Sequence, residues 1–249
     1  MENVPKHMLS RMLYANPVCI LTVGGNAMTL TWLTCLDNHG HFLASLNAKR
    51  HSASLLMSQP PDQRLFVLSV PTEGMEALVW SIGSRSGRED VSSESDSHPA
   101  PSKLLDLGVA TCLPGWRSTD AFAQAEHQLK ETQRGKKQKV DASAASFSIQ
   151  HGLVALSDCV AHLICRVEEV QDRHGHHVLF CLIEAAFVKH AYWDGKNFAP
   201  LRDPATRELL GKPYFSFLGT KCFAVTIPLS IAPETASSSL ESEDQKVKE

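Results

Sequence analysis

The sequence lacks the features that mark several large classes of protein. No apolar run among its 249 residues approaches the ~20 residues of a membrane-spanning helix. The first residues, 1–7, also lack the apolar core of a secretory signal. The net charge of -3 leaves no surplus of cations for neutralising nucleic-acid phosphates. These absences predict a protein whose partner is neither a membrane nor a nucleic acid.

The cysteines and glycines exclude further classes. Seven cysteines, an odd number without a Cys-x-x-Cys pair, fall mostly inside apolar runs. They indicate free, buried thiols in a reducing compartment, and hence a cytoplasmic protein. The Gly-x-Gly-x-x-Gly motif of dinucleotide-binding Rossmann domains is missing, and no segment repeats. What remains is an ordinary composition, 43% apolar and 20% charged, typical of a globular domain.

Segments of strand length make up most of the apolar sequence, and only two segments, 53–57 and 72–82, have helical character. The polar residues 171–177 predict the turn of a β-hairpin. Because strands are many, helices are few and no β-α-β rhythm is present, the pattern favours an antiparallel barrel. The expected strands are 18–23, 26–32, 41–46, 64–70, 159–170 and 178–188.

Two polar stretches interrupt this pattern, near 84–101 and 126–146. They predict solvated insertions in a single domain over 1–229, which a disordered tail follows at 230–249. For the second stretch a nucleic-acid patch is the alternative, but its lack of aromatics and the negative net charge favour a solvated loop. The cations that cluster there are Lys130, Arg134, Lys136, Lys137 and Lys139.

The segment 26–32, Asn-Ala-Met-Thr-Leu-Thr-Trp, is the most informative of the expected strands. Its alternation puts Thr29 and Thr31 on one face and the apolar side chains on the other. Threonines at alternate strand positions are most often a solvent face. They also suit hydrogen bonds to a ligand that lies along the strand. For the ring of Trp32, packing in the core is the expected role.

The segment 45–52 ends a strand and enters a short apolar helix. Ser52 is placed as the N-cap of that helix, and Lys49, Arg50 and His51 come just before it. Free backbone N–H groups, the positive end of the helix dipole and mobile cations converge there, which favours a bound phosphate. A charged helix entry on an ordinary surface is the alternative. Together with the hydroxyl-lined strand, the segment suggests a phosphorylated cofactor lying along a sheet.

These pieces, in this order, resemble the flavin reductase-like family of FMN-binding split barrels over residues 16–200. The strand at 26–32 is similar to the family's Asn-Ala-x-Thr-x-Ser/Thr-Trp strand, which is the most diagnostic match. Segment 45–52 is similar to the strand-to-helix segment that holds the FMN phosphate. The remaining matches are 17–22, 177–180 and 192–196.

The chain departs from the family pattern at three places. His176 stands where the family commonly has an Asp directly before its histidine, here His177. Ser52 stands where Thr is common. The family's Ser-Gly dipeptide, at 86–87 in this chain, is normally followed soon by a lysine near the cofactor. Here the candidate lysine, Lys103, comes only after an acidic insertion.

The resemblance implies a mainly β fold, an antiparallel Greek-key split β-barrel with a few short peripheral helices. It implies FMN as the cofactor, NADH or NADPH as the hydride donor, and a homodimer with the flavin near its interface. No catalytic acid or base is assigned, because hydride transfer needs positioning above all. The implied cofactor contacts are Asn26, Ala27, Met28, Thr29, Leu30, Thr31, Trp32, Ser45, Leu46, Asn47, Lys49, Arg50, His51, Ser52, Lys103 and His177.

Alternatives remain for the histidines and for the activity. His174, His176 and His177 in one turn raise the possibility of a metal site, but no Cys, Asp or Glu at ligand spacing completes a set, so no metal is expected. Two other functions compete with an oxidoreductase. One is a flavin-binding or electron-carrier protein without turnover, and the other is a barrel that has lost FMN and acts as an interaction module.

Overall fold

The computed structural model describes residues 5–85, 87, 103–116, 152–219 and 222–228. The predicted insertions near 84–101 and 126–146 fall largely outside these residues, and the predicted tail at 230–249 falls wholly outside them. Their predicted character, like the boundary of the domain at 229, stays a prediction.

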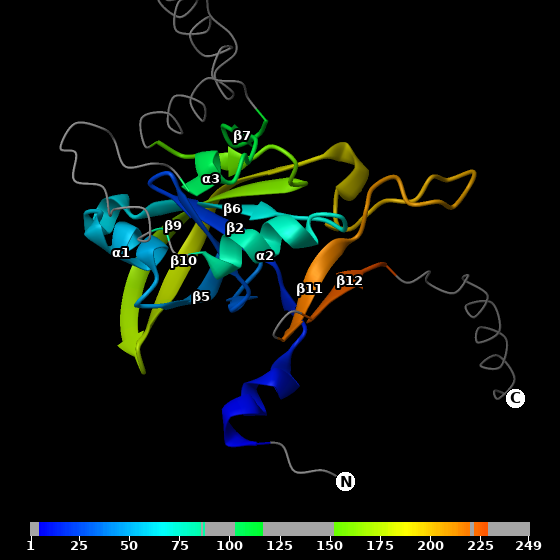
Figure 1. Ribbon diagram of the computed structural model, residues 1–249. Helices are drawn as coiled ribbons and strands as arrows, with labels where there is room; N and C mark the ends of the chain where they lie inside the picture. Colours follow the sequence, from blue (N-terminus) through cyan, green and yellow to red (C-terminus); the bar gives the residue numbers. More distant parts are fainter. Residues whose placement is uncertain (1–4, 86, 88–102, 117–151, 220–221, 229–249) are drawn as a thin grey trace, which may run out of the picture.

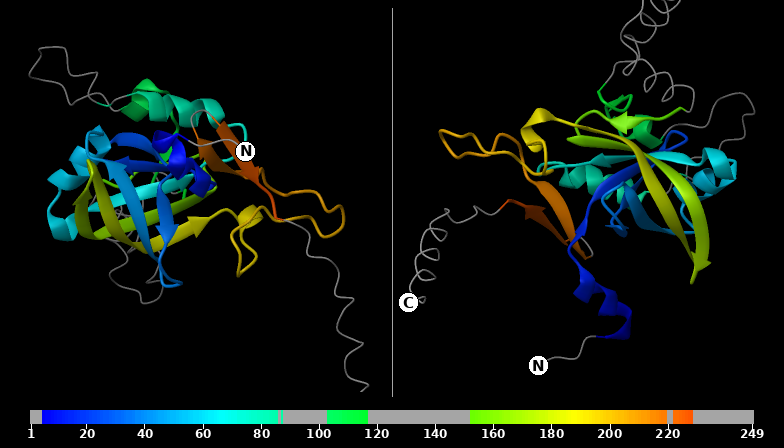
Figure 2. Two further views of the ribbon diagram at one scale, coloured as in Figure 1. Left: turned by 90° about the horizontal axis from the view of Figure 1, so that it is seen from below. Right: turned by 180° about the vertical axis from the view of Figure 1, so that it is seen from behind.

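A seven-stranded antiparallel sheet forms the body of the molecule (Figure 1). Its strand order is β3-β2-β6-β9-β10-β5-β4, so β6 lies between two hairpins that are distant in sequence. The sheet curls into an open barrel (Figure 2), and its two edge strands, β3 and β4, are joined by residues 31–32 alone. The prediction of a mainly β, antiparallel split barrel is confirmed. The strands are β2 (Cys19–Val23), β3 (Asn26–Leu30), β4 (Leu33–Cys35), β5 (His41–Asn47), β6 (Leu65–Val70), β9 (Ala161–Arg173) and β10 (His176–Val188).

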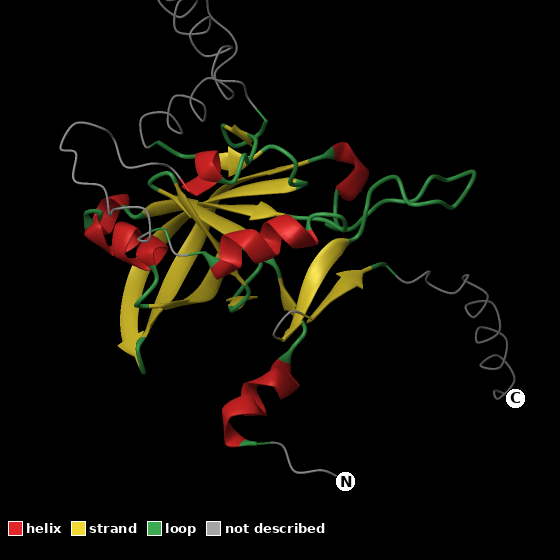
Figure 3. Ribbon diagram, in the orientation of Figure 1, coloured by secondary structure: helices red, strands yellow, loops and turns green. Residues whose placement is uncertain are grey.

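Smaller elements surround this barrel. A second sheet, in the order β1-β11-β12, lies beside it, and β7 pairs with β8. The helices are short and peripheral (Figure 3), as predicted. The bounds are β1 (Asn16–Pro17), β7 (Thr111–Cys112), β8 (Ala155–Leu156), β11 (Tyr214–Gly219), β12 (Cys222–Thr226), η1 (Lys6–Leu13), α1 (His51–Ser58), η2 (Pro61–Gln63), α2 (Glu76–Ser84), α3 (Lys103–Asp106) and η3 (His190–Tyr192).

The hairpin of β2 and β3 separates two apolar cores. Leu21 points into the barrel core, whereas Ile20 packs in a second core beneath α2, together with Val79 and Ile82 of that helix. All five residues of β2 are therefore buried. A strand covered on both faces needs a continuous apolar run, because neither face meets water. This arrangement fixes α2 over β3, and the candidate site lies between these two elements.

The turn between β9 and β10 is tighter than the sequence indicates. Residues 171–177 were expected to form it, but the strands extend to Arg173 and resume at His176. Only His174 and Gly175 turn the chain, with φ of 47° and 80°. Two consecutive positive φ values are the mark of a type I′ turn, whose twist matches that of paired strands. The polar residues were misleading because this end of the hairpin extends beyond the core.

His162 anchors the segment 103–116 to the barrel. Its ring is fully buried on β9, where Nε2 donates to the Leu156 carbonyl at 2.9 Å and Nδ1 accepts from the Gly115 N–H at 3.2 Å. Burial lowers the pKa of His162 to about 4. The imidazole is therefore neutral near pH 7, and its role is structural.

The seven cysteines are all free. Four of them, Cys19, Cys159, Cys165 and Cys181, are buried as expected, and burial raises their pKa values. The prediction is wrong for two others, because Cys35 and Cys222 are exposed near the ends of short strands. An apolar run predicts burial only where another layer covers it.

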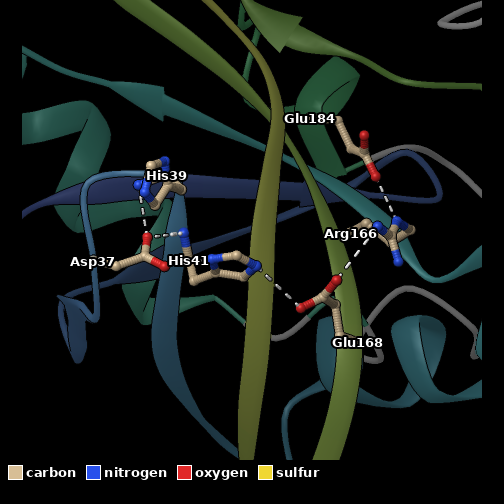
Figure 4. Close-up of polar contacts among 6 residues, drawn as sticks. All are labelled: Asp37, His39, His41, Arg166, Glu168 and Glu184. Carbon is tan, nitrogen blue, oxygen red and sulfur yellow. Dashed lines mark hydrogen bonds and ion pairs between the residues drawn. The ribbon is translucent and has the colours of Figure 1, made fainter.

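A chain of polar contacts crosses the exposed surface of β5, β9 and β10 (Figure 4). Asp37 accepts from His41 Nδ1 at 2.6 Å, and His41 Nε2 lies 3.8 Å from a Glu168 oxygen. Arg166 then joins Glu168 to Glu184. The side chains that make these contacts are each at least a third exposed, so the contacts add little stability. They lie outside the candidate site.

Candidate functional site

A groove lies between β3 and the end of α2. Its volume is about 300 Å³, at the lower end of the range for small-molecule sites. The floor comes from β3 and the residue after it, one wall from α2, and the opposite side from β11 and β12. The lining residues are Met28, Thr29, Thr31, Arg50, Val79, Trp80, Gly83, Ser84, Phe217 and Phe223.

The two threonines expected to face a ligand both line this groove. The hydroxyl hydrogen of Thr29 is already used, because it is donated to the Val79 carbonyl at 2.9 Å. Its oxygen can therefore only accept a hydrogen bond from a ligand. The close approach depends on Gly83, where a Cβ would lie 3.2 Å from Thr29 Oγ1. Thr31 lies beyond the end of β3 and completes the hydroxyl-bearing floor.

Helix α1 begins two residues earlier than predicted. Its N-cap is Arg50, not Ser52, and no side chain caps it. Ser52 is instead a buried residue of the first turn, where it accepts from Asn26 Nδ2 at 2.8 Å. The prediction of a Ser52 cap is wrong, because the hydroxyl is used by a residue distant in sequence.

The first turn of α1 has an unusual charge. A helix N-terminus is stabilised by negative charge, yet this one has no acidic residue and follows Lys49 and Arg50, with His51 at its first position. Both cations are exposed. Arg50 also donates from Nη1 to the Gly83 carbonyl at 3.3 Å, which brings the guanidinium to the groove. The N-terminus of α1 is therefore uncapped and cationic, and a bound anion would stabilise it.

Two buried polar atoms next to this terminus have unused hydrogen-bonding capacity. Asn26 Oδ1 and His51 Nδ1 have no partner among the described residues. Gly87 covers them so closely that a Cβ there would lie 2.6 Å from Asn26 Oδ1. Since Ser52 Oγ can donate or accept, a turned Asn26 amide would keep that bond and present its N–H groups instead. The cluster can therefore supply donors to an anion.

Lys103 lies beneath the groove wall and does not reach the groove. Its ammonium is buried and donates to three carbonyls, those of Ala27 at 3.0 Å, Ile82 at 2.6 Å and Arg85 at 2.8 Å. An ammonium has three donors. All three are accounted for by backbone oxygens of β3 and of the end of α2.

The other expected contacts are spread over different surroundings. The side chains of Ala27, Leu30 and Leu46 are buried in the two cores, so only their backbone could meet a ligand. Asn47 is exposed, and its Oδ1 accepts from the Lys49 N–H at 2.9 Å.

Trp32 and Ser45 line a second cavity, of about 360 Å³, apart from the groove. The Trp32 ring is 40% exposed, stacks on His176 with 5.4 Å between centroids, and donates from Nε1 to Tyr14 Oη at 3.3 Å. The expectation that it packs in the core is wrong. Since β3 ends at Leu30, the alternation of faces no longer holds at residue 32.

His177 lies near the end of the β9–β10 hairpin, opposite Asp172. Its Nδ1 lies 2.5 Å from Asp172 Oδ1, and the ring is 19% exposed. The turn reaches the loop before α1, because the Ala48 N–H donates to the Gly175 carbonyl at 3.0 Å. A cross-strand carboxylate therefore fixes the orientation of this histidine.

Sequence reasoning missed the α2 wall, the aromatic side of the groove, and Asp172. Gly83 was a usable signal, because a glycine inside a helix is costly unless another group approaches closely. Phe217 and Phe223 gave none, since they belong to the separate β11–β12 sheet. Among the described residues, no group of His, Cys, Asp and Glu could hold a metal ion, and no helix is long and apolar enough to cross a membrane.

A family model described as the flavin reductase like domain matches residues 9–200 of this chain. The chain belongs to the flavin reductase-like family. The match spans the seven-stranded barrel, the hairpin with His177 and the part of the groove formed by β3, Arg50 and α2, whereas Phe217 and Phe223 lie beyond it. A search of curated proteins finds no match.

Solved structures support the fold of this flavin reductase-like chain. An FMN-binding protein from Thermus thermophilus with bound p-hydroxybenzaldehyde is 16% identical, with a TM-score of 0.56 over 94% of this chain and 97% of the other. Flavoredoxin from Methanosarcina acetivorans is 14% identical, with a TM-score of 0.55 over 96% and 98%. An NADH:FAD oxidoreductase from Streptomyces globisporus is 17% identical, with a TM-score of 0.52 over 92% and 98%. At these identities the likeness shows the fold.

One departure from the family pattern has a structural counterpart. Where the family commonly has an Asp directly before the histidine, this flavin reductase-like chain has His176, whose ring faces Trp32 instead. The carboxylate beside His177 comes from Asp172, across the hairpin. Directly opposed residues of antiparallel strands have neighbouring side chains on one face, so the other strand can supply the same group.

Proposed function

We propose that this protein is an FMN-binding oxidoreductase that accepts hydride from NADH or NADPH. The observation that carries the proposal is the uncapped, cationic N-terminus of α1 beside a groove with hydroxyls on its floor. An FMN phosphate has about two negative charges at neutral pH, so it needs fixed cations and free donors. Membership of the flavin reductase-like family supports the same conclusion.

Two regions of the site would hold different parts of the cofactor. The phosphate would be held by Lys49, Arg50 and the N–H groups of the first turn of α1. The buried polar atoms of Asn26 and His51 would lie behind these groups. Thr31 and the accepting oxygen of Thr29 would hydrogen-bond the ribityl chain or the ring edge. The exposed Trp80 would cover one side of the ring.

The chemistry and the positioning have different sources. Bound FMN supplies a ring that takes up a hydride from reduced nicotinamide. The protein supplies orientation through Thr29 and Thr31, charge through Arg50, and exclusion of water through Trp80, Phe217 and Phe223. No side chain has to give or take a proton in that step.

We propose further that a second copy of the chain completes the site. β11 and β12 line one side of the groove, and large apolar side chains of α2, of these two strands and of the residue just after β12 are exposed. These are Trp80 at 42%, Leu218 at 41%, Val225 at 40% and Ile227 at 45%. Covering such a patch is favourable and is typical of protein interfaces. A homodimer with the flavin near the interface accounts for the exposure.

An anaerobic titration tests the activity. The purified protein is saturated with FMN, mixed with NADH or with NADPH, and followed by visible flavin absorbance. The expected result is bleaching by at least one nucleotide at a rate well above that of free FMN with the same nucleotide. Light scattering of the same sample, with and without FMN, measures the mass of the assembly.

Each alternative function has its own outcome. Tight binding of FMN without bleaching by either nucleotide would overturn the reductase and leave a flavin-binding or electron-carrier protein. A preparation that FMN cannot restore to yellow would overturn both and leave an interaction module.

A further inference from the structure

We propose that Lys103 is a positioning residue that sets the width of the groove by clamping α2 onto β3. The proposal rests on the proposed function, in that the groove is taken to hold the flavin. It departs from the role that the family resemblance implies, which is direct contact with the cofactor.

The three acceptors of Lys103 belong to the two sides of the groove. Ala27 directly precedes Met28 and Thr29 of the floor, whereas Ile82 and Arg85 flank Gly83 and Ser84 of the wall. One ammonium therefore joins floor and wall. Thr29 of the floor adds a second link, since its hydroxyl donates to the Val79 carbonyl one turn earlier in α2.

The clamp is suited to its place by charge and burial. The last carbonyls of a helix are the negative end of its dipole and have no partner within the helix, so a cation stabilises them. β3 is an edge strand, so its outward carbonyls also lack a strand partner. Lys103 is only 7% exposed, and a side chain without donors would leave these oxygens buried and unpaired.

The geometry opposes a direct contact between Lys103 and a phosphate. Every donor of the ammonium already has a carbonyl within 3.0 Å, so a bond to the cofactor would require breaking one of them. Arg50 and Lys49 lie at the α1 terminus and are exposed. We assign the phosphate to them and the groove geometry to Lys103.

Binding of FMN and of riboflavin, which lacks the phosphate, separates these roles. Lys103→Met should weaken both ligands equally, by about tenfold or more, since it removes charge-assisted bonds that define the groove. Arg50→Ala should weaken FMN alone. Lys103→Arg, which keeps the cation and its donors, should retain most of the affinity. Lys196→Met, at an exposed lysine in a distant turn, should change neither ligand.

A second readout needs no flavin. Hydrogen exchange of the α2 amides should quicken by about tenfold in Lys103→Met while the amides of β9 and β10 stay protected, since only the clamped helix loosens. If Lys103→Met does not fold, the same two measurements are made on Lys103→Gln, which keeps two of the donors and should show a smaller change in both.

Three results would overturn the clamp. Selective loss of FMN in Lys103→Met, with riboflavin unchanged, would make Lys103 a phosphate ligand. A lower melting temperature with unchanged affinity for both flavins and unchanged exchange in α2 would make it a general stabilising residue. If Lys103→Met had the exchange rates of α2, the flavin affinities and the melting temperature of the wild type, Lys103 would have no role in the groove. If the wild-type protein binds neither flavin, the proposed function fails, and the exchange of α2 alone decides whether the clamp exists.

Discussion

Two hollows in the described part of the molecule differ in their chemistry, the groove between β3 and α2 and a larger cavity at the mouth of the barrel. The mouth cavity measures about 760 Å³, more than twice the 300 Å³ of the groove. It is lined almost wholly by apolar side chains, among them Leu163, Phe198 and Tyr214, and no charged residue lines it. The Tyr214 hydroxyl is itself used, since it donates to the Phe198 carbonyl at 3.1 Å.

We infer from this difference that hydrogen-bonding capacity, more than volume, decides which hollow suits a phosphorylated ligand. A dianionic phosphate loses too much hydration in the mouth cavity, where nothing replaces its water. The smaller groove has hydroxyls, Arg50 and the end of a helix. We therefore expect substitutions in the mouth cavity to change stability and substitutions in the groove to change flavin binding.

The largest effect is expected from Phe198→Ala in the mouth cavity. The ring stacks on Tyr214, with 5.1 Å between centroids and 5° between planes. Its removal should lower the free energy of unfolding by about 3 kcal/mol, through lost burial and an enlarged void. Urea unfolding measures this loss. FMN affinity of the folded protein should not change. A fivefold or greater loss of affinity would show that the two hollows act as one site.

The next effect is expected from Lys49→Ala combined with Arg50→Ala. Removing both cations should weaken FMN by about 100-fold, because two charge-assisted contacts to the phosphate are lost. Riboflavin affinity should stay the same. Fluorescence titration with the two ligands measures both. The control is Lys136→Ala with Lys137→Ala, which removes as much charge from a different segment of the sequence. Equal losses in the two double variants would mean that the phosphate binds somewhere else.

A smaller effect is expected from Gly87→Ala. The new Cβ would lie 2.6 Å from Asn26 Oδ1 and 2.9 Å from His51 Cδ2, so these side chains must move. FMN affinity should fall by about tenfold, as the donors behind the phosphate are displaced. Gly83→Ala is the matched comparison, because its closest contact, to Thr29 Oγ1 at 3.2 Å, is milder. A larger loss in Gly83→Ala would place the important contact at the floor instead.

The smallest effect is expected from Glu184→Gln in the exposed polar chain on β5, β9 and β10. It removes an ion pair with Arg166 whose members are about a third exposed, and should change the free energy of unfolding by less than about 0.5 kcal/mol. FMN affinity should be unchanged. Urea unfolding in low and high salt measures the first. A marked loss of flavin affinity would mean that this surface belongs to the site.

The features of the candidate site that depend on neighbouring residues could be predicted from the sequence. The threonine alternation at 29 and 31 and the cations before α1 are patterns of neighbouring residues, and both meet at the groove. The helix start was misplaced, since Arg50 is the N-cap and Ser52 bonds to Asn26, a residue distant in sequence. The role of Trp32 was misjudged because the strand ends two residues earlier. Asp172 gave no signal, since its pairing with His177 depends on hairpin register.

The sequence by itself determined what depends on neighbours along the chain. The period of two in the strands and the run of apolar residues in β2 sufficed for the barrel, and the cluster of cations at 49–51 led to the prediction of a phosphate site. Only the tertiary structure decided which distant groups meet. Lys103 is bonded to Ala27, 76 residues earlier, and no local pattern encodes that contact. The physical reason is that periodicity reports which face is buried, whereas the partner of a buried polar group is fixed by how the layers pack.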